Sequence, residues 1–187
     1  MPESLADRVS DSEVEVPGKQ GNSADVTAAV IAQLTARHMT LAVAESLTGG
    51  LLTAEFIRIP GASLVVNGGI VAYNTELKHT LLGVDAALLA AHGAVHPHVA
   101  IAMASGVRSC LPVDGRRADV GISTTGVAGP DSQDGQSPGT VFVGVSIGMH
   151  SVALDLQLVG DRESIRRQTV IRAVEAVNEL IAEHLSE

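Results

Sequence analysis

Short apolar segments alternate with helical patterns along most of the chain, and this alternation restricts the possible folds more than any other feature. Three of these segments have the composition of buried strands: residues 40–44 (TLAVA), 68–73 (GGIVAY) and 118–124 (ADVGIST). Helical patterns separate them. Such alternation is typical of α/β proteins, in which helices cover a sheet.

Two further strands follow without a helix between them, over residues 140–147 and 152–159. They are close enough to pair antiparallel around a turn at residues 148–150. The sequence therefore predicts an α/β fold, a three-layer α/β/α sandwich with a mixed, mainly parallel sheet closed by a C-terminal antiparallel hairpin.

Capping residues indicate where the helices should begin. Ser23 or Asn22 can cap a helix that runs from near Ala24 to about His38. Further helices are expected over residues 51–59, after caps at Asn74, Asp85 and His96, and after Asp161.

Composition excludes several classes of function. The net charge of -9 is opposite to the basic footprint of a DNA-binding domain. Only three aromatic residues, Phe56, Tyr73 and Phe142, are available to stack on single-stranded nucleic acid, which is too few. Cys110 is the only cysteine, so the chain has no internal disulfide and no multi-cysteine zinc site. We therefore expect no nucleic-acid partner.

The N-terminal sequence predicts a tail and gives no sign of export. Residues 1–22 contain few apolar residues, so we expect a flexible acidic N-terminal tail, followed by a single domain over residues 23–187. No apolar run approaches the roughly 18 residues that a transmembrane helix needs. The polar, acidic N-terminus does not resemble a secretory signal. We expect a cytoplasmic protein with no membrane partner.

The first candidate site is the segment Ser46-Leu47-Thr48-Gly49-Gly50, directly after the strand at 40–44. Open α/β sheets bind ligands at the carboxyl ends of their strands. A helix that starts there offers free N–H groups to an anion, and the glycines let the backbone approach a substrate. The alternative is that Ser46 or Thr48 only caps that helix.

The second candidate pairs Tyr73 with Lys78 at the end of the next strand. If Asn74 starts a helix, Lys78 lies about one turn into it, close to Tyr73. Lys19 lies in the predicted tail, so Lys78 is the only lysine of the predicted domain. Burial would favour its neutral form, which can act as a general base. The alternative is an ordinary surface lysine.

Two more segments could hold a ligand. In the turn-rich loop after the strand at 118–124, Thr125, Gly126, Ala128 and Gly129 could line a phosphate or sugar pocket, although an exposed turn has the same composition.

Near the start of the last helix, Arg162 and Arg166 share one helix face and could bind phosphate. The alternative for these two arginines is a surface ion-pair network with Glu163. His92, His96 and His98 are not expected to bind a metal, because Gly93 and Pro97 interrupt the segment and no metalloprotease pattern accompanies them.

Seven motifs in a fixed order make residues 24–185 resemble the C-terminal domain family of the competence- and damage-inducible protein CinA, which includes nicotinamide mononucleotide deamidases. The motifs are AESLTGG, PGAS-x4-GGIVAYN-x3-K, LLGV, HGAV, TGVAGPD, PGTVFVG and GDRESIRRQ. The resemblance implies a hydrolase that converts nicotinamide mononucleotide and water to nicotinic acid mononucleotide and ammonia, in pyridine nucleotide salvage.

The resemblance also implies roles for individual residues. Ser46 would be the nucleophile and Lys78 its base, with Tyr73 orienting this Ser/Lys dyad and no metal or cofactor required. We expect the N–H groups of residues 48–50 to form the oxyanion hole. The substrate phosphate would bind Arg162, Arg166 or the backbone of residues 126–129. A homo-oligomer is expected, with a dimer as the simplest closed form.

Two other functions stay open. The same dyad could hydrolyse another small amide, or the chain could be a non-catalytic nucleotide-binding module in competence or the DNA-damage response. The loop after Gly129-Pro130 also departs from the glycine pair that often follows in the family, since it reads DSQDGQSPGT here.

Overall fold

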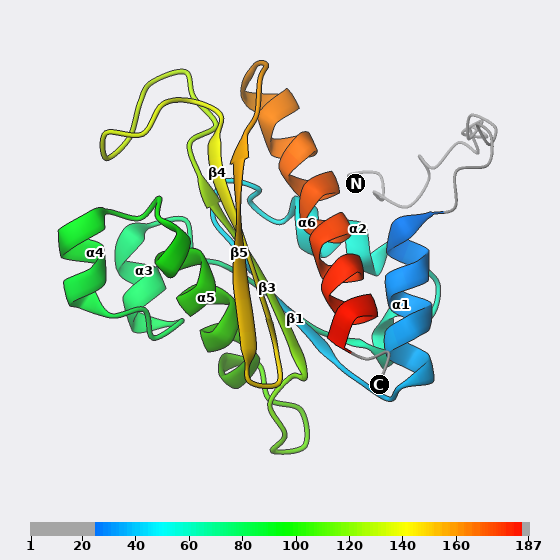
Figure 1. The fold of residues 1–187 in the computed structure, drawn as a ribbon. Coiled ribbons are helices and arrows are strands. Elements are labelled where there is room, and N and C mark those ends of the chain that lie inside the picture. Colours follow the sequence, from blue (N-terminus) through cyan, green and yellow to red (C-terminus); the bar gives the residue numbers. More distant parts are fainter. Residues whose placement is uncertain (1–24, 185–187) are drawn as a thin grey trace, which may run out of the picture.

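The computed structural model describes residues 25–184, so the predicted tail at 1–22 and the caps proposed at Asn22 and Ser23 lie outside the described residues. A five-stranded sheet lies between two layers of helices (Figure 1). The elements in chain order are α1 (Val26–Ala36), β1 (Leu41–Glu45), α2 (Leu51–Ile57), the 3-10 helix η1 (Ala62–Leu64), β2 (Val66–Val71), α3 (Thr75–Thr80), α4 (Ala86–His92), α5 (Pro97–Cys110), β3 (Val120–Gly126), β4 (Thr140–Ile147), β5 (His150–Gln157) and α6 (Arg162–His184).

The sheet is mixed, with the strand order β2-β1-β3-β4-β5. β1 pairs in parallel with both β2 and β3, whereas β4 is antiparallel to β3 and to β5. β4 therefore runs against the other four strands, and β4 with β5 forms the C-terminal hairpin. The predicted three-layer fold with a mixed, mainly parallel sheet is confirmed.

Each face of the sheet has its own hydrophobic core, because the central strands are buried on both sides. Side chains of β1 alternate between the two cores: Leu41 and Val43 pack under α1, α2 and α6, while Ala42 and Ala44 pack under α5 and the segments around it. Figure 1 shows α1, α2 and α6 on one side of the sheet and α3, α4 and α5 on the other.

Helix α5 lies very close to the sheet because two strand residues lack a side chain. A Cβ at Gly121 of β3 would lie 1.9 Å from the carbonyl oxygen of Ala104, and one at Gly144 of β4 would lie 2.3 Å from that of Ala100. The hydroxyl of Ser123 donates a 2.7 Å hydrogen bond to the same Ala100 oxygen. These contacts place the start of α5 beside the carboxyl end of β3.

Most of the predicted caps are confirmed. Asn74, Asp85, His96 and Asp161 each accept a hydrogen bond from a backbone N–H in the first turn of the helix that follows. Asp25 caps α1 through the N–H groups of Thr27 and Ala28, so that helix begins two residues later than expected.

Among the described residues, no helix is long and apolar enough to cross a membrane.

Candidate active site

Ser46 and Lys78 meet at the carboxyl end of the parallel strands. Ser46 follows β1, and Lys78 comes from α3, the helix after β2. The Nζ atom of Lys78 lies 3.0 Å from Oγ of Ser46 and donates a second hydrogen bond of 2.8 Å to the carbonyl oxygen of Ala72. The predicted spacing of Lys78 about one turn into a helix is confirmed, and it brings the amine onto the serine.

Lys78 is buried, with only 1% of its surface exposed. Desolvation lowers the pKa of its ammonium from 10.5 to about 8, because burial disfavours the charged form, while the carboxylate of Asp134 acts in the opposite direction. The interpretation of Lys78 as an ordinary surface lysine is therefore wrong. A lysine with a pKa near 8 holds a substantial neutral fraction at mildly alkaline pH, as a general base requires.

Glu45, the last residue of β1, fixes the turn that carries Ser46. Its fully buried carboxylate accepts hydrogen bonds from the N–H groups of Gly50, Leu52 and Thr53, at 2.8–3.0 Å, and from the Thr53 hydroxyl at 2.6 Å. Glu45 thus satisfies the start of α2, and neither Ser46 nor Thr48 caps that helix. The capping alternative for Ser46 is wrong, which leaves its hydroxyl facing Lys78.

We expect Glu45→Gln to destabilise the fold by about 3 kcal/mol, because the amide NH2 would face backbone donors in a buried site. Urea unfolding followed by circular dichroism measures this difference. Glu76→Gln, an exposed change in the first turn of α3, should leave stability within about 0.5 kcal/mol of wild type. Equal stability of the two variants would contradict this role for Glu45.

Arg166 holds the turn after Ser46 from the opposite side. Its Nε donates to the carbonyl oxygen of Leu47 and one terminal nitrogen donates to that of Thr48, while the other terminal nitrogen pairs with Glu163. The Thr48 hydroxyl is buried against the hydroxyl of Thr124, at 2.8 Å. Arg166 is therefore a support of the turn, and its guanidinium is already engaged.

The predicted oxyanion hole needs a correction. The N–H groups of Gly49 and Gly50 are taken, the first by the carbonyl oxygen of Ser46 and the second by Glu45. The N–H groups of Leu47 and Thr48 donate no hydrogen bond to another described residue. Of the predicted donors at residues 48–50, only the Thr48 N–H is therefore available, and the Leu47 N–H adds a donor one residue earlier than expected.

Ser46 opens onto a cavity of about 540 Å³. Seven predicted site residues line this cavity: Ser46, Tyr73, Thr125, Gly126, Ala128, Gly129 and Arg162. Five others do not line it: Thr48, Gly49, Gly50, Lys78 and Arg166. The Thr48 hydroxyl, the N–H groups of Gly49 and Gly50 and the Arg166 guanidinium are engaged in holding the turn behind Ser46 and do not face the cavity.

Arg162 and Tyr73 meet across this cavity. Arg162 donates one hydrogen bond to the carbonyl oxygen of Gly129, at 2.8 Å, and a second to the Tyr73 hydroxyl, at 3.1 Å. Among the described residues, the Tyr73 hydroxyl forms a hydrogen bond with Arg162 and none with Ser46 or Lys78. Through these bonds Arg162 connects α6 to the segment after β2 and to the loop after β3, at the carboxyl end of the sheet.

Sequence reasoning missed several cavity residues. The further lining residues are Leu47, Asn74, Thr75, Ala94, Val95, Val127, Pro130, Asp131, Ser132 and Gln133. Ala94 and Val95 belong to the HGAV motif, so the motif was visible although its position in the fold was not. Their proximity follows from the close approach of α5 to the sheet.

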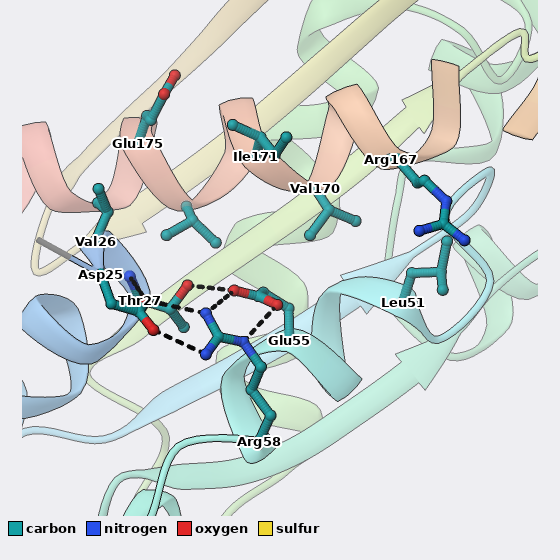
Figure 2. Close-up of a pocket in the computed structure, with 11 residues that line it drawn as sticks. Asp25, Val26, Thr27, Leu51, Glu55, Arg58, Arg167, Val170, Ile171 and Glu175 are labelled. Carbon is teal, nitrogen blue, oxygen red and sulfur yellow. Dashed lines mark hydrogen bonds and ion pairs between the residues drawn. The ribbon is translucent and has the colours of Figure 1, made fainter. Parts of the chain in front are cut away.

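A second hollow of about 630 Å³ lies between α1, α2 and α6 (Figure 2). At its edge Arg58 forms ion pairs with Asp25 and Glu55, over an apolar floor that includes Val170 and Val174. Neither Ser46 nor Lys78 lines it. The hydroxyl of Thr27 in this hollow donates a hydrogen bond to Glu55, whose carboxylate also pairs with Arg58, so the pKa of Glu55 is lowered and it is a poor base.

The three histidines near α5 pack on each other. The ring centroids of His92 and His96 lie 4.4 Å apart in a stacked arrangement, and His98 meets His96 edge-on at 5.1 Å. In residues 25–184 no group of three or more His, Cys, Asp or Glu side chains is arranged to hold a metal ion.

These features define a class: an α/β sandwich that holds a serine against a buried lysine at the carboxyl ends of its parallel strands. A family model described as the CinA C-terminal domain matches residues 23–181. The chain belongs to this family, and the predicted resemblance is confirmed.

Relatives agree with this assignment. A CinA-like protein from Frankia casuarinae is 46% identical over 153 residues, which cover 82% of this chain and 34% of the relative. A CinA-like protein from Gemmatimonas aurantiaca is 41% identical over 159 residues, covering 84% of this chain and 36% of that protein. This chain thus spans about a third of the length of these curated relatives.

Solved structures share the fold. A competence-damaged protein (CinA) superfamily protein from Klebsiella pneumoniae matches with a TM-score of 0.79 and 31% identity, over 87% of this chain and 99% of that one. A CinA superfamily protein from Escherichia coli matches with a TM-score of 0.78 and 29% identity, over 87% and 94%.

Proposed function

We propose that the chain is a metal-independent amidohydrolase that converts nicotinamide mononucleotide and water to nicotinic acid mononucleotide and ammonia. The observation that carries this proposal is the 3.0 Å contact between Oγ of Ser46 and Nζ of Lys78. Lys78 is buried behind the serine and does not itself line the cavity. A base that contacts the cavity only through a serine is arranged to activate that serine.

The chemistry proceeds in two halves. Neutral Lys78 takes the proton of Ser46 as Oγ attacks the carboxamide carbon, and it then gives that proton to the nitrogen that leaves as ammonia. In the second half Lys78 takes a proton from water, which attacks the acyl-enzyme ester, and returns it to Oγ as the acid departs. The N–H groups of Leu47 and Thr48 stabilise the oxyanion of both tetrahedral intermediates.

The substrate phosphate is assigned to Arg162 and to the backbone beside it. Arg162 is the only arginine or lysine among the described cavity-lining residues. Ala128 and Gly129 also line the cavity, and their N–H groups donate no hydrogen bond to another described residue. A guanidinium next to free N–H groups suits a phosphate dianion.

Arg162→Met should raise KM for nicotinamide mononucleotide about tenfold or more, with a smaller change in kcat, because a charge-assisted contact to phosphate is lost. Steady-state kinetics with the phosphate-free nicotinamide riboside serve as the internal control. If Arg162 binds phosphate, the substitution should change the riboside reaction much less. An equal loss for both substrates would contradict the assignment.

The proposal is tested by incubating the purified chain with nicotinamide mononucleotide and measuring ammonia and nicotinic acid mononucleotide. Both products should form in equal amounts, and the rate should rise with pH through the pKa of Lys78, near 8. If the chain hydrolyses only a different small amide, that amide takes the place of nicotinamide mononucleotide as the proposed substrate. Calorimetric binding of the nucleotide without any product would favour the non-catalytic module.

A further inference from the structure

The loop between β3 and β4 forms one wall of the serine cavity through Asp131, Ser132 and Gln133. Its tip is a tight turn in which Gln133 and Gln136 exchange backbone hydrogen bonds of 3.0 and 2.8 Å. The two residues at the corner, Asp134 and Gly135, have φ values of 51° and 77°. This conformation suits an Asp-Gly pair at the end of a two-residue hairpin.

One hydrogen bond ties this wall to the rest of the domain. Oδ2 of Asp134 accepts from the backbone N–H of Ala94, at 3.1 Å. Among the described residues it is the only hydrogen bond that links residues 130–136 to another segment. The turn also rests on Gly93, where an added Cβ would come within 2.7 Å of the Asp134 side chain. Gly93 therefore leaves room for Asp134 to reach Ala94.

We propose that Asp134 is a positioning residue of the cavity: by accepting the hydrogen bond from Ala94, it holds residues 131–133 as the wall that the substrate meets. This inference rests on the proposed function for the meaning of the cavity. It adds a residue that does not line the cavity and that shapes it from outside.

Asp134 also acts on Lys78 through its charge. The hydrogen-bond partners of the Lys78 Nζ atom, the Ser46 hydroxyl and the Ala72 carbonyl, are both uncharged. The Asp134 carboxylate works against the effect of burial on the pKa of Lys78.

Asp134→Ala and Asp134→Asn separate the two effects. The alanine variant loses the acceptor, so KM for nicotinamide mononucleotide should rise about tenfold with a smaller change in kcat, and the Ala94 amide should lose its protection from hydrogen exchange. The asparagine variant keeps an acceptor and removes the charge. Its KM and the hydrogen-exchange protection of the Ala94 amide should stay near wild type. The pH at which its kcat begins to rise should be lower than in wild type.

The chain contains a matched control turn. Asp114 and Gly115 have φ values of 51° and 73° and sit in a two-residue turn closed by Val113 and Arg116. This turn precedes β3 and so lies at the opposite end of the sheet from the cavity. Asp114→Ala and Asp114→Asn should leave KM, Ala94 exchange and the pH profile unchanged. A KM for Asp134→Ala equal to that of Asp114→Ala would overturn the proposal.

Two readouts do not depend on catalysis, so the proposal and the proposed function can fail separately. With 13C-labelled lysine, the chain gives signals from only Lys19 and Lys78, and Lys78→Met assigns them. The pH midpoint at which the Lys78 signal titrates should fall in Asp134→Asn and should not change in Asp114→Asn. An unchanged midpoint would overturn the electrostatic role, and unchanged Ala94 exchange in Asp134→Ala would overturn the docking role, whether or not the nucleotide is hydrolysed.

Discussion

Ser46→Ala should abolish hydrolysis of nicotinamide mononucleotide, with a loss of kcat on the order of a thousandfold or more, because no other hydroxyl is placed to attack with Lys78 as its base. Stability should stay within about 1 kcal/mol of wild type, since the alanine removes one hydrogen bond and Lys78 keeps its bond to the carbonyl of Ala72. Ammonia release and thermal unfolding measure the two quantities.

The same variant distinguishes chemistry from binding. The substrate contacts assigned to Arg162, Ala128 and Gly129 are intact in Ser46→Ala, so calorimetry should give a nucleotide affinity close to that of wild type. Ser105→Ala, an exposed change on α5, is the matched control for the loss of a hydroxyl and should keep full activity. Residual turnover of Ser46→Ala comparable to wild type would exclude Ser46 as the nucleophile.

Those parts of the site that lie at the ends of strands could be predicted from the sequence. Ser46 and Lys78 each follow a short apolar strand, and parallel strands deliver such residues to one edge of the sheet. The cap at Asn74 then fixed how far into its helix Lys78 would lie. Their meeting at 3.0 Å follows from local patterns that are visible in the chain.

The support behind Ser46 could not be predicted, because it depends on tertiary contacts. Arg162 and Arg166 share a helix face, yet one lines the cavity and the other holds the backbone at Leu47 and Thr48. Helical spacing gives two residues a common direction but does not say which neighbouring segment each one meets. Only the packing of α6 beside the turn after β1 separates their roles.

The role of the buried Glu45 carboxylate could not be predicted from the sequence either. Its partners lie only five to eight residues ahead, but the chain must first turn back through two left-handed glycines, Gly49 and Gly50, to present them. The pattern of a hydroxyl before a helix favoured Ser46 or Thr48 as the cap. With Glu45 in that position, the serine hydroxyl is available for chemistry.

Lys78→Met should remove catalysis and also change how stability depends on pH. Methionine keeps the length of the buried side chain without a basic nitrogen, so kcat should fall by roughly 10²- to 10⁴-fold, the usual contribution of a general base. Lys78→Arg should be inactive as well, because arginine stays protonated at any pH at which the protein folds.

The stability effect follows from the lowered pKa of Lys78. Below pH 8 the lysine is protonated in both the folded and the unfolded chain, so the folded state bears the full cost of a buried charge. Between pH 8 and 10.5 the unfolded chain binds more protons than the folded one, and stability therefore rises with pH. The full change from 10.5 to about 8 corresponds to about 3 kcal/mol.

Urea unfolding of wild type and Lys78→Met at a series of pH values isolates this effect, because every other titrating group is common to both proteins. The free energy of unfolding of wild type should gain up to about 3 kcal/mol on that of the variant between pH 8 and 10.5, with a constant difference below pH 8. Parallel curves across the whole range would mean that Lys78 titrates normally. It would then lack the neutral form that the proposed mechanism needs near neutral pH.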